Sequence, residues 1–376
     1  MRRLLLPILL CVAPLAAQSP PTPEPGDARP PERFDRAGIE AAVRAAMAAQ
    51  EIPGVVVGIL EGDALAMRLA LGQRDLARDL PMTTDCLFQV GSVTKSLTAC
   101  LLARLCERGT VALDDPLSRH WPEDAPMPAA LGERTLRQLA THTAGLPRNP
   151  ANRRNLPDSP SVMLPYSHAE LHAAVADVAI AEAGDAAEFA YSNFSYAVLG
   201  HALEHAAGQP LAVLLRDEVF SPLGMSSSGI EPSAAQEARL ATPYWTTDTP
   251  RVARPRWQFG EVAAFAGVFS SVDDLARFVA AQYAADDAFL PVARRAELHR
   301  GAIPVAPEQG RSLGIGWFVQ RMPTGTVIGH GGEVDGFSAN VAFLPKRRIG
   351  LVVLANLGGR AADAVAMAVL GALQKR

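Results

Sequence analysis

The chain has 376 residues, of which 49% are hydrophobic and 20% are charged. This composition excludes a disordered protein, and the 30 glycines follow no collagen period. The formal net charge is −4 and no basic run alternates with aromatic residues, so we expect no nucleic-acid partner.

The start of the chain is predicted to direct export. Two arginines precede an apolar run over residues 4–15, and two alanines follow it. This order is typical of a secretory signal peptide, assigned to residues 1–17, and the run is too short to span a bilayer. Residues 18–33 are Pro-rich and are predicted to form an extended tether. We therefore expect an exported protein, periplasmic or secreted, with no stable membrane span after signal cleavage.

The rest of the chain alternates between helical and strand-like patterns. Hydrophobic periodicity predicts a helix over 34–50, a buried strand over 54–60, short strands near 64–71 and a long apolar helix over 93–107. Helices, broken by Pro-rich loops, are predicted to dominate residues 110–262. The last part is predicted to contain strands over 316–321, 326–329, 337–344 and 350–357, followed by a helix over 360–373.

These elements indicate one catalytic domain over residues 34–373. Short connections between the last strands favour antiparallel neighbours, so the end of the chain is predicted to form a small sheet with the terminal helix packed on it. We predict an α+β fold in which the two ends of the chain form an antiparallel sheet flanked by helices. A mostly helical subdomain, at roughly residues 110–262, is inserted between them.

Three cysteines follow the predicted leader. Cys100 and Cys106 fall six residues apart in one predicted helix, which is about 9 Å of rise and too far for a disulfide. Cys86 could pair with either of them. We favour the interpretation that all three are buried free thiols.

Lysine use singles out one position. Of the 35 basic residues, Lys95, Lys346 and Lys375 are the lysines. Lys95 lies among apolar and small residues at the start of the predicted 93–107 helix. A desolvated ammonium can lose its proton, whereas an arginine stays charged. Lys95 is therefore predicted to act as a base.

Ser92 is a matching partner for that base. It lies three residues before Lys95, so the two side chains share one face of a helix that begins here. The positive end of the helix dipole would favour an alkoxide-like oxygen on Ser92 and a neutral Lys95. The alternative is structural, with Ser92 capping the helix and Lys95 as a solvated charge in its first turn.

Two further motifs accompany this pair. Tyr191-Ser192-Asn193 precedes a predicted helix, and His330-Gly331-Gly332 follows a predicted strand and precedes another. In this order and spacing, the set resembles the serine β-lactamase and penicillin-binding protein superfamily, in its class C and D-Ala-D-Ala carboxypeptidase branch. The likeness spans roughly residues 36–373 and includes LDDP at 113–116, THTAGLP at 141–147, PLGM at 222–225 and AGVFSS at 266–271. The resemblance implies a β-lactamase/transpeptidase-like fold.

The resemblance also implies catalytic roles. Ser92 would attack a carbonyl carbon and form an acyl-enzyme, and Lys95 would help to remove the hydroxyl proton. Tyr191 would share the role of base and then protonate the leaving group.

The residues implied in substrate binding are Asn193, His330, Gly331, Gly332 and Glu333. Asn193 would bind the substrate amide and hold the Lys95 amine. The backbone N–H groups of Glu333 and of the nucleophilic serine would form an oxyanion hole.

One motif departs from the β-lactamase pattern. Where those enzymes carry Lys-Thr-Gly, this chain has His330-Gly331-Gly332. A histidine is mostly neutral at pH 7 and Gly331 has no hydroxyl, so binding of a substrate carboxylate should be weaker. Relatives with His at this place include esterases and D-amino-acid amidases. We therefore favour ester or D-amino-acid amide cleavage over efficient β-lactam hydrolysis.

The predicted function is a serine hydrolase that acts through an acyl-enzyme on ester, D-amino-acid amide or peptide, or β-lactam substrates. The esterase, D-aminopeptidase and carboxypeptidase types all remain open. The alternative is a covalent penicillin-binding receptor or sensor that is acylated and does not turn over. The loops over 147–165 and 226–257 are expected to shape the pocket.

A competing motif suggests metal chemistry. The segment from His201 through Glu204 to His205 matches the H-x-x-E-H signature of zinc peptidases. The packing stripe expected for this helix places both histidines on the opposite side, facing solvent. We therefore expect no metal and no cofactor. His142 and His168 have no motif partner and are interpreted as hydrogen-bonded structural groups.

Overall fold

The computed structural model describes residues 34–156, 159–180, 188–247, 249–322 and 325–373. The predicted signal peptide and tether, residues 1–33, lie outside these ranges and stay predictions. Within the described ranges, no helix is both long enough and apolar enough to cross a membrane.

One antiparallel sheet joins the two ends of the chain. In the described part it has nine strands in the order β3-β2-β1-β13-β12-β11-β10-β9-β8. The strands are β1 (Gly54–Glu61), β2 (Ala64–Asp75), β3 (Leu80–Pro81), β8 (Ile303–Ala306), β9 (Arg311–Leu313), β10 (Phe318–Met322), β11 (Gly325–Val334), β12 (Phe337–Leu344) and β13 (Ile349–Ala355). The predicted α+β architecture is confirmed. The antiparallel pairing of β1 with β13 also confirms that the two ends of the chain form the sheet, although the sheet is larger than the last strands alone suggested.

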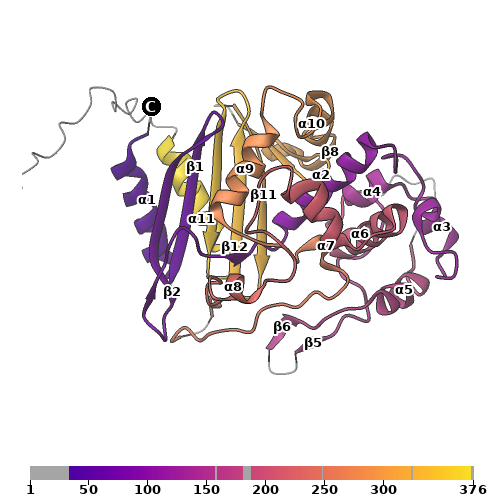
Figure 1. Ribbon diagram of the computed structural model, residues 1–376, viewed down its shortest axis with the longest axis horizontal. Coiled ribbons are helices and arrows are strands. Elements are labelled where there is room, and N and C mark those ends of the chain that lie inside the picture. Colours follow the sequence, from indigo (N-terminus) through magenta and orange to yellow (C-terminus); the bar gives the residue numbers. More distant parts are fainter. Residues whose placement is uncertain (1–33, 157–158, 181–187, 248, 323–324, 374–376) are drawn as a thin grey trace, which may run out of the picture.

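Both faces of the sheet are buried at its central strands β1 and β13, which explains the unbroken apolar run of β1. Val55, Val57 and Ile59 share a core with α1 (Arg36–Gln50) and α11 (Ala361–Leu373). Val56 and Leu60 point to the opposite face, where they join the core that includes α2 (Val93–Glu107) and α9 (Val272–Gln282). The molecule therefore has three layers on this side, with α1 and α11, the sheet, and then α9 and α2 (Figure 1).

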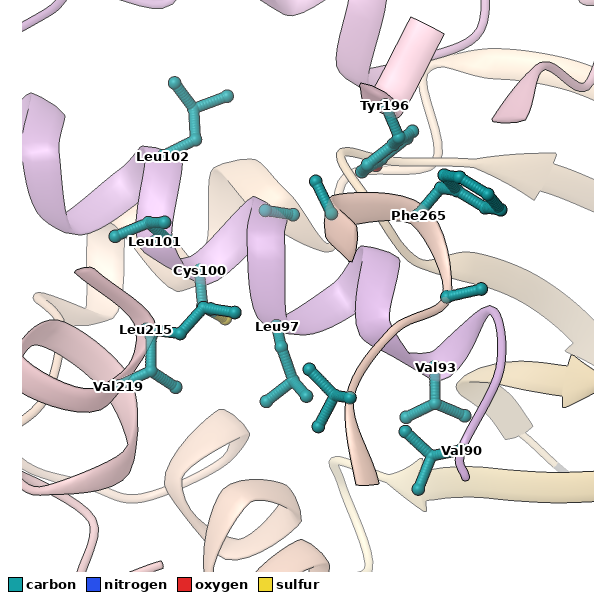
Figure 2. Packing of buried hydrophobic residues seen from close by; sticks show 14 of the residues in the cluster. Val90, Val93, Leu97, Cys100, Leu101, Leu102, Tyr196, Leu215, Val219 and Phe265 are labelled. Carbon is teal, nitrogen blue, oxygen red and sulfur yellow. The ribbon is translucent and has the colours of Figure 1, made fainter. Parts of the chain in front are cut away.

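Helix α2 is the central element of the second core. Every residue from Val93 to Ala103 is buried. Leu215 and Val219 pack on one side of this helix, and Tyr196 and Phe265 pack on another (Figure 2). The bounds predicted from the sequence are confirmed, since the apolar run is long and Gly109 follows its end with a positive φ of 71°.

Residues 110–262 of the described chain are mostly short helices and loops. They hold η1 (Leu117–His120), α3 (Ala129–Gly132), α4 (Leu136–Ala140), β5 (Asn155–Leu156), β6 (Ser159–Met163), α5 (His168–Ala176), α6 (Asn193–Ala207), α7 (Leu211–Leu215), the π-helical turn η2 (Arg216–Phe220) and α8 (Ala234–Glu237). Elsewhere lie β4 (Phe88–Gln89), η3 (Ala263–Phe265), β7 (Phe269–Ser270), α10 (Val292–Leu298) and η4 (Pro307–Gln309). In Figure 1, α3, α4, α5, α6 and α7 lie to the right of the sheet, whereas α8 lies below it. The assignment of this region as an insert stays a prediction.

The prediction that His201 and His205 both face solvent is wrong for His201. All residues of α6 from Phe194 to Leu203 are buried. Trp121 packs on the His201 ring at 5.0 Å between centroids, and α5 covers the same side of the helix through His172. The prediction assumed that other elements cover only one face of this helix, whereas α6 is covered on several sides. His205 is exposed, as predicted.

The three cysteines of the described chain are free, which confirms the interpretation that none is paired. Cys86 and Cys100 are buried, whereas Cys106 is half-buried. Burial raises the pKa of the Cys100 thiol to about 12. This thiol is therefore an unreactive part of the core.

Candidate active site

Ser92 and Lys95 meet at the start of α2. Gly91, with a φ of 52°, leads the chain into the helix. Ser92 occupies the N-cap position, but its side chain makes no capping hydrogen bond. Its Oγ instead lies 3.1 Å from Lys95 Nζ, and Lys95 is completely buried. The alternative of a helix cap with a solvated lysine is therefore wrong.

The Lys95 amine is fixed by two acceptors besides Ser92. Nζ lies 2.8 Å from Asn193 Oδ1 and 2.9 Å from the Phe265 carbonyl oxygen. Because both oxygens can only accept, they take two N–H bonds and leave the third position of the nitrogen facing Ser92. Burial, together with the nearby charge of Arg148, lowers the pKa of Lys95 well below its ordinary value. A neutral Lys95 then presents its lone pair to the Ser92 hydroxyl and can accept the proton.

Tyr191 contacts both members of this pair. Its ring centroid lies 4.9 Å from Lys95 Nζ, and its hydroxyl interacts with the Ser92 side chain. Burial raises the pKa of Tyr191 to about 12, although Ser92 and Arg148 act in the opposite direction. The hydroxyl is therefore protonated at neutral pH, which favours a proton donor over the shared base role expected from the sequence.

The THTAGLP loop positions the Tyr191-Ser192-Asn193 motif. The Ser192 N–H donates to His142 Nδ1 at 3.1 Å, and the Ser192 hydroxyl donates to the Pro147 carbonyl oxygen at 2.7 Å. The His142 ring packs on Tyr191 with 4.5 Å between centroids. Burial lowers the pKa of His142 well below its ordinary value, so it is a neutral acceptor. The interpretation of His142 as a hydrogen-bonded structural group is confirmed.

Strand β11 brings its second half against the start of α2. The His330-Gly331-Gly332 motif lies inside β11 and does not follow it, which corrects the predicted strand end. The register with β10 stops at Gly329, so the remainder of β11 extends past that neighbour. A Cβ on Gly332 would lie 1.9 Å from the Val90 carbonyl oxygen, and one on Gly91 would lie 2.5 Å from the Glu333 nitrogen. Glycine at these two positions lets the backbones of Ser92 and Glu333 approach closely.

His330 supplies no positive charge to the site. It is 4% exposed, and burial is the largest cause that lowers its pKa to about 3. Its Nδ1 lies 2.7 Å from the Gly331 carbonyl oxygen, which can only accept, so Nδ1 carries the proton. The substituted motif therefore presents a neutral ring.

These groups border a cleft of about 410 Å³. Of the site residues predicted from the sequence, Ser92, Tyr191, Asn193, His330, Gly331, Gly332 and Glu333 all line it, and Lys95 is bonded to two of them. Both loops expected to shape the pocket contribute to it. The loop over 147–165 supplies Arg148, Asn149 and Arg153, and the loop over 226–257 supplies Trp245 and Trp257.

The sequence did not predict the four arginines that line this cleft, Arg148, Arg153, Arg311 and Arg360, of which Arg148 and Arg311 pack on aromatic rings of the site. The Arg148 guanidinium lies 5.3 Å from the Tyr191 ring centroid, and that of Arg311 lies 4.4 Å from the Phe318 ring centroid. Within the described residues, neither guanidinium is in an ion pair. Arg148 directly follows the THTAGLP loop, a signal that could have found it, whereas Arg311 lies on β9, a strand with no clear pattern. The cleft thus holds positive charge that the His330 motif does not provide.

The chain is similar in sequence to known proteins over most of its length. Residues 39–375 match the family model described as Beta-lactamase. The chain is 27% identical to the D-alanyl-D-alanine-carboxypeptidase/endopeptidase AmpH of Escherichia coli (strain K12), over 80% of this chain and 78% of that protein. It is 22% identical to Protein flp of Staphylococcus aureus (strain NCTC 8325 / PS 47), over 81% of this chain and 60% of that longer protein.

Two solved structures share the fold. The octameric penicillin-binding protein homologue from Pyrococcus abyssi superposes with a TM-score of 0.74 at 24% identity, over 90% of this chain and 77% of that chain. The class C beta lactamase from Rhodobacter sphaeroides superposes with a TM-score of 0.72 at 22% identity, over 89% of this chain and 98% of that chain. The predicted β-lactamase/transpeptidase-like fold and superfamily are confirmed.

Proposed function

The chain belongs to the beta-lactamase family of serine hydrolases, and we propose that it cleaves D-amino-acid amide or peptide bonds through an acyl-enzyme on Ser92. The observation that carries this proposal is the 3.1 Å contact between Lys95 Nζ and Ser92 Oγ. The other two positions of the amine are already taken by Asn193 and the Phe265 carbonyl. This leaves Lys95 one direction in which to accept a proton, toward Ser92.

Acylation follows from these contacts. Neutral Lys95 takes the hydroxyl proton while Ser92 Oγ forms a bond to the carbonyl carbon of the substrate. The backbone N–H groups of Ser92 and Glu333 stabilise the negative charge on the carbonyl oxygen. Tyr191 gives its proton to the leaving nitrogen as the C–N bond breaks, and it regains a proton from Lys95. Water then attacks the acyl carbon along the reverse path and releases the acid and free Ser92.

The arginines of the cleft support a substrate with a carboxylate near the scissile bond. Arg148 and Arg311 both line the cleft, and guanidinium groups bind carboxylates in a forked geometry. The name of the AmpH relative indicates cleavage of D-alanyl-D-alanine. We therefore rank peptides that end in D-alanine first among the substrates.

Esters and β-lactams differ from these peptides in the contacts that their cleavage requires. A simple ester needs the acylation groups and no carboxylate contact, so it should be cleaved as well. The neutral His330 stands where β-lactamases place a lysine, which supports inefficient hydrolysis of β-lactams. We also propose that the chain is exported, because residues 1–17 have the order of a signal peptide.

A parallel substrate panel tests this function. The panel comprises a D-Ala-D-Ala peptide, a D-alanyl amide, a short-chain chromogenic ester and a chromogenic cephalosporin, with the wild type and Ser92→Ala. Steady-state turnover of the peptide or amide, lost in Ser92→Ala, supports the proposal. Turnover of the cephalosporin at a far higher rate than the others contradicts the substrate ranking. A persistent adduct in the intact mass without turnover of any substrate contradicts hydrolysis and supports a covalent receptor.

A further inference from the structure

Three side chains of the helical region converge at a point apart from the catalytic cleft. His168 is the first residue of α5, and His201 and Glu204 lie one turn apart on α6. One ligand atom from each lies within 4.8 Å of the others. Glu204 Oε2 is 2.9 Å from His168 Nε2 and 3.5 Å from His201 Nδ1. None of the three residues lines the cleft that Ser92 borders.

The atoms that face one another in this cluster are unsatisfied. His168 Nε2, His201 Nδ1 and Glu204 Oε2 are all buried and have no hydrogen-bond partner within the described residues. The contact of His168 with Glu204 is therefore short but poorly aligned for a hydrogen bond. His201 is 8% exposed, so its ring is largely shielded from bulk solvent. The two imidazole nitrogens lie at ion-pair distance from the carboxylate oxygen but outside hydrogen-bond geometry, so the buried cluster offers ligand atoms to a further group.

The far side of each residue is held in place by a second group. The partners are His172 Nε2 for His201 Nε2 (2.8 Å), the Leu211 N–H for Glu204 Oε1 (2.7 Å) and Glu261 Oε2 for His168 Nδ1 (3.7 Å). Metal-binding histidines commonly use their second nitrogen in this way, which sets the tautomer and the direction of the ring. With the protons on His168 Nδ1 and His201 Nε2, the lone pairs of His168 Nε2 and His201 Nδ1 face Glu204 and can bind a shared ligand.

We propose that His168, His201 and Glu204 bind one divalent transition-metal ion, with Zn²⁺ as the best match. Two imidazole nitrogens and one carboxylate oxygen are ligands that Zn²⁺ takes in proteins, and three protein ligands leave a fourth position open. The same residues line a cavity of about 740 Å³, from which water can fill that position. Calcium and magnesium prefer oxygen ligands and fit this donor set poorly.

This ligand set differs from the one that the H-x-x-E-H motif suggests. His205 is exposed and does not belong to the cluster. His168, which lies 33 residues before His201 in the sequence, supplies the second imidazole. The sequence motif therefore includes two of the three proposed ligands, His201 and Glu204, together with His205, which should not bind the ion.

The ion has a structural role in this proposal. It links α5 to α6 and, through the Leu211 contact of Glu204, to the start of α7. Helix α6 begins at Asn193, which binds the Lys95 amine, so an ion in the middle of α6 holds a helix that the catalytic cleft uses. The proposal does not depend on the hydrolytic function and can be tested without a substrate.

Direct titration with Zn²⁺ tests the site. The purified full chain is stripped with EDTA and titrated with Zn²⁺ in competition with a chromophoric chelator, and thermal unfolding is followed with and without Zn²⁺. The wild type should bind one Zn²⁺ per chain and unfold at a higher temperature when Zn²⁺ is present. Loss of a residue that only supports a metal ligand weakens metal binding about 10–100-fold, so Glu204→Gln and His168→Gln should each weaken it by at least that much.

His205→Gln is the matched control, because it removes an imidazole from the same helix and should bind Zn²⁺ like the wild type. Glutamine at position 204 keeps an acceptor for the Leu211 N–H. Should that variant fail to fold, His168→Gln gives the same readout, since the His168 side chain is 28% exposed. A wild type that leaves all Zn²⁺ with the chelator overturns the proposal. So does a loss of binding in His205→Gln that is absent in the other two variants.

Discussion

Helix α6 contributes to two buried polar clusters that differ in how their atoms are paired. Its first residue, Asn193, belongs to the cluster around Lys95, where the amine has three neighbours within 3.1 Å. Further along the same helix, His201 and Glu204 meet His168, and the three atoms that face one another have no hydrogen-bond partner in the described chain. The catalytic cluster is thus complete in the protein alone, whereas we propose that a bound ion completes the second cluster.

This difference separates two ways of building a site. A catalytic cluster must hold its groups in place before the substrate arrives, because reorganisation during the reaction adds to the barrier. A metal site is completed by its ion, and its unpaired ligand atoms destabilise the fold until the ion binds. The pairing of the buried atoms therefore distinguishes the two functions without any bound ligand.

Removal of the nucleophile should have the largest effect and tests whether the first cluster is catalytic. Ser92→Ala is expected to lower kcat by about 10³-fold or more with every substrate, since loss of a serine nucleophile can cost about 10⁶-fold. Ser96→Ala on the same helix is the control, because that hydroxyl binds the Gly316 carbonyl oxygen outside the cleft lining. Ser92→Ala activity that is close to that of the wild type and of Ser96→Ala would show that Ser92 is not the nucleophile.

Replacement of the base is the next largest change. Lys95→Arg keeps a positive charge that cannot be removed near neutral pH, so kcat should fall by about 10²–10⁴-fold. In the wild type, the active form has a neutral Lys95, so kcat/KM should rise with pH through the pKa of Lys95, which burial places well below 10.5. A pH profile measured from 5 to 10 checks this sign. A rate that falls over the whole range would assign the proton transfer to another group.

The second cluster predicts a smaller effect at a supporting residue. His172→Gln removes the imidazole that faces His201 Nε2 but leaves all three proposed ligands. Zn²⁺ affinity should fall about 10–100-fold in the chelator competition, while hydrolysis with Zn²⁺ in excess stays close to that of the wild type. Unchanged affinity would mean that His172 does not orient His201.

The smallest expected effect concerns substrate recognition in the cleft. Arg311→Gln should raise KM about 10-fold for a peptide with a free carboxylate, because one charge-assisted contact is lost. KM for a neutral ester should stay the same, and this ester is the control. Equal changes for both substrates would indicate a general disturbance of β9 rather than carboxylate binding.

The elements that sequence reasoning found are those with strong local patterns. Helix α2 has a long apolar run, and its bounds agree with the prediction. Strands β8 and β9 were missed because they have three or four residues and no alternating pattern. The burial of His201 was missed as well, because the covering residues Trp121 and His172 come from elements far from it in the sequence.

The pairing of Ser92 with Lys95 could be predicted from the local sequence. A spacing of three residues on one helix places the hydroxyl beside the amine, whatever else surrounds them. The motifs at Tyr191 and His330 could be named from the sequence, but only the packing of α6 and β11 against α2 brought them to the same cleft. Tertiary structure alone placed Arg311 there and replaced His205 with His168 in the second cluster. The physical reason is that local spacing sets which side chains share one element, whereas burial and the meeting of distant side chains depend on how the elements pack.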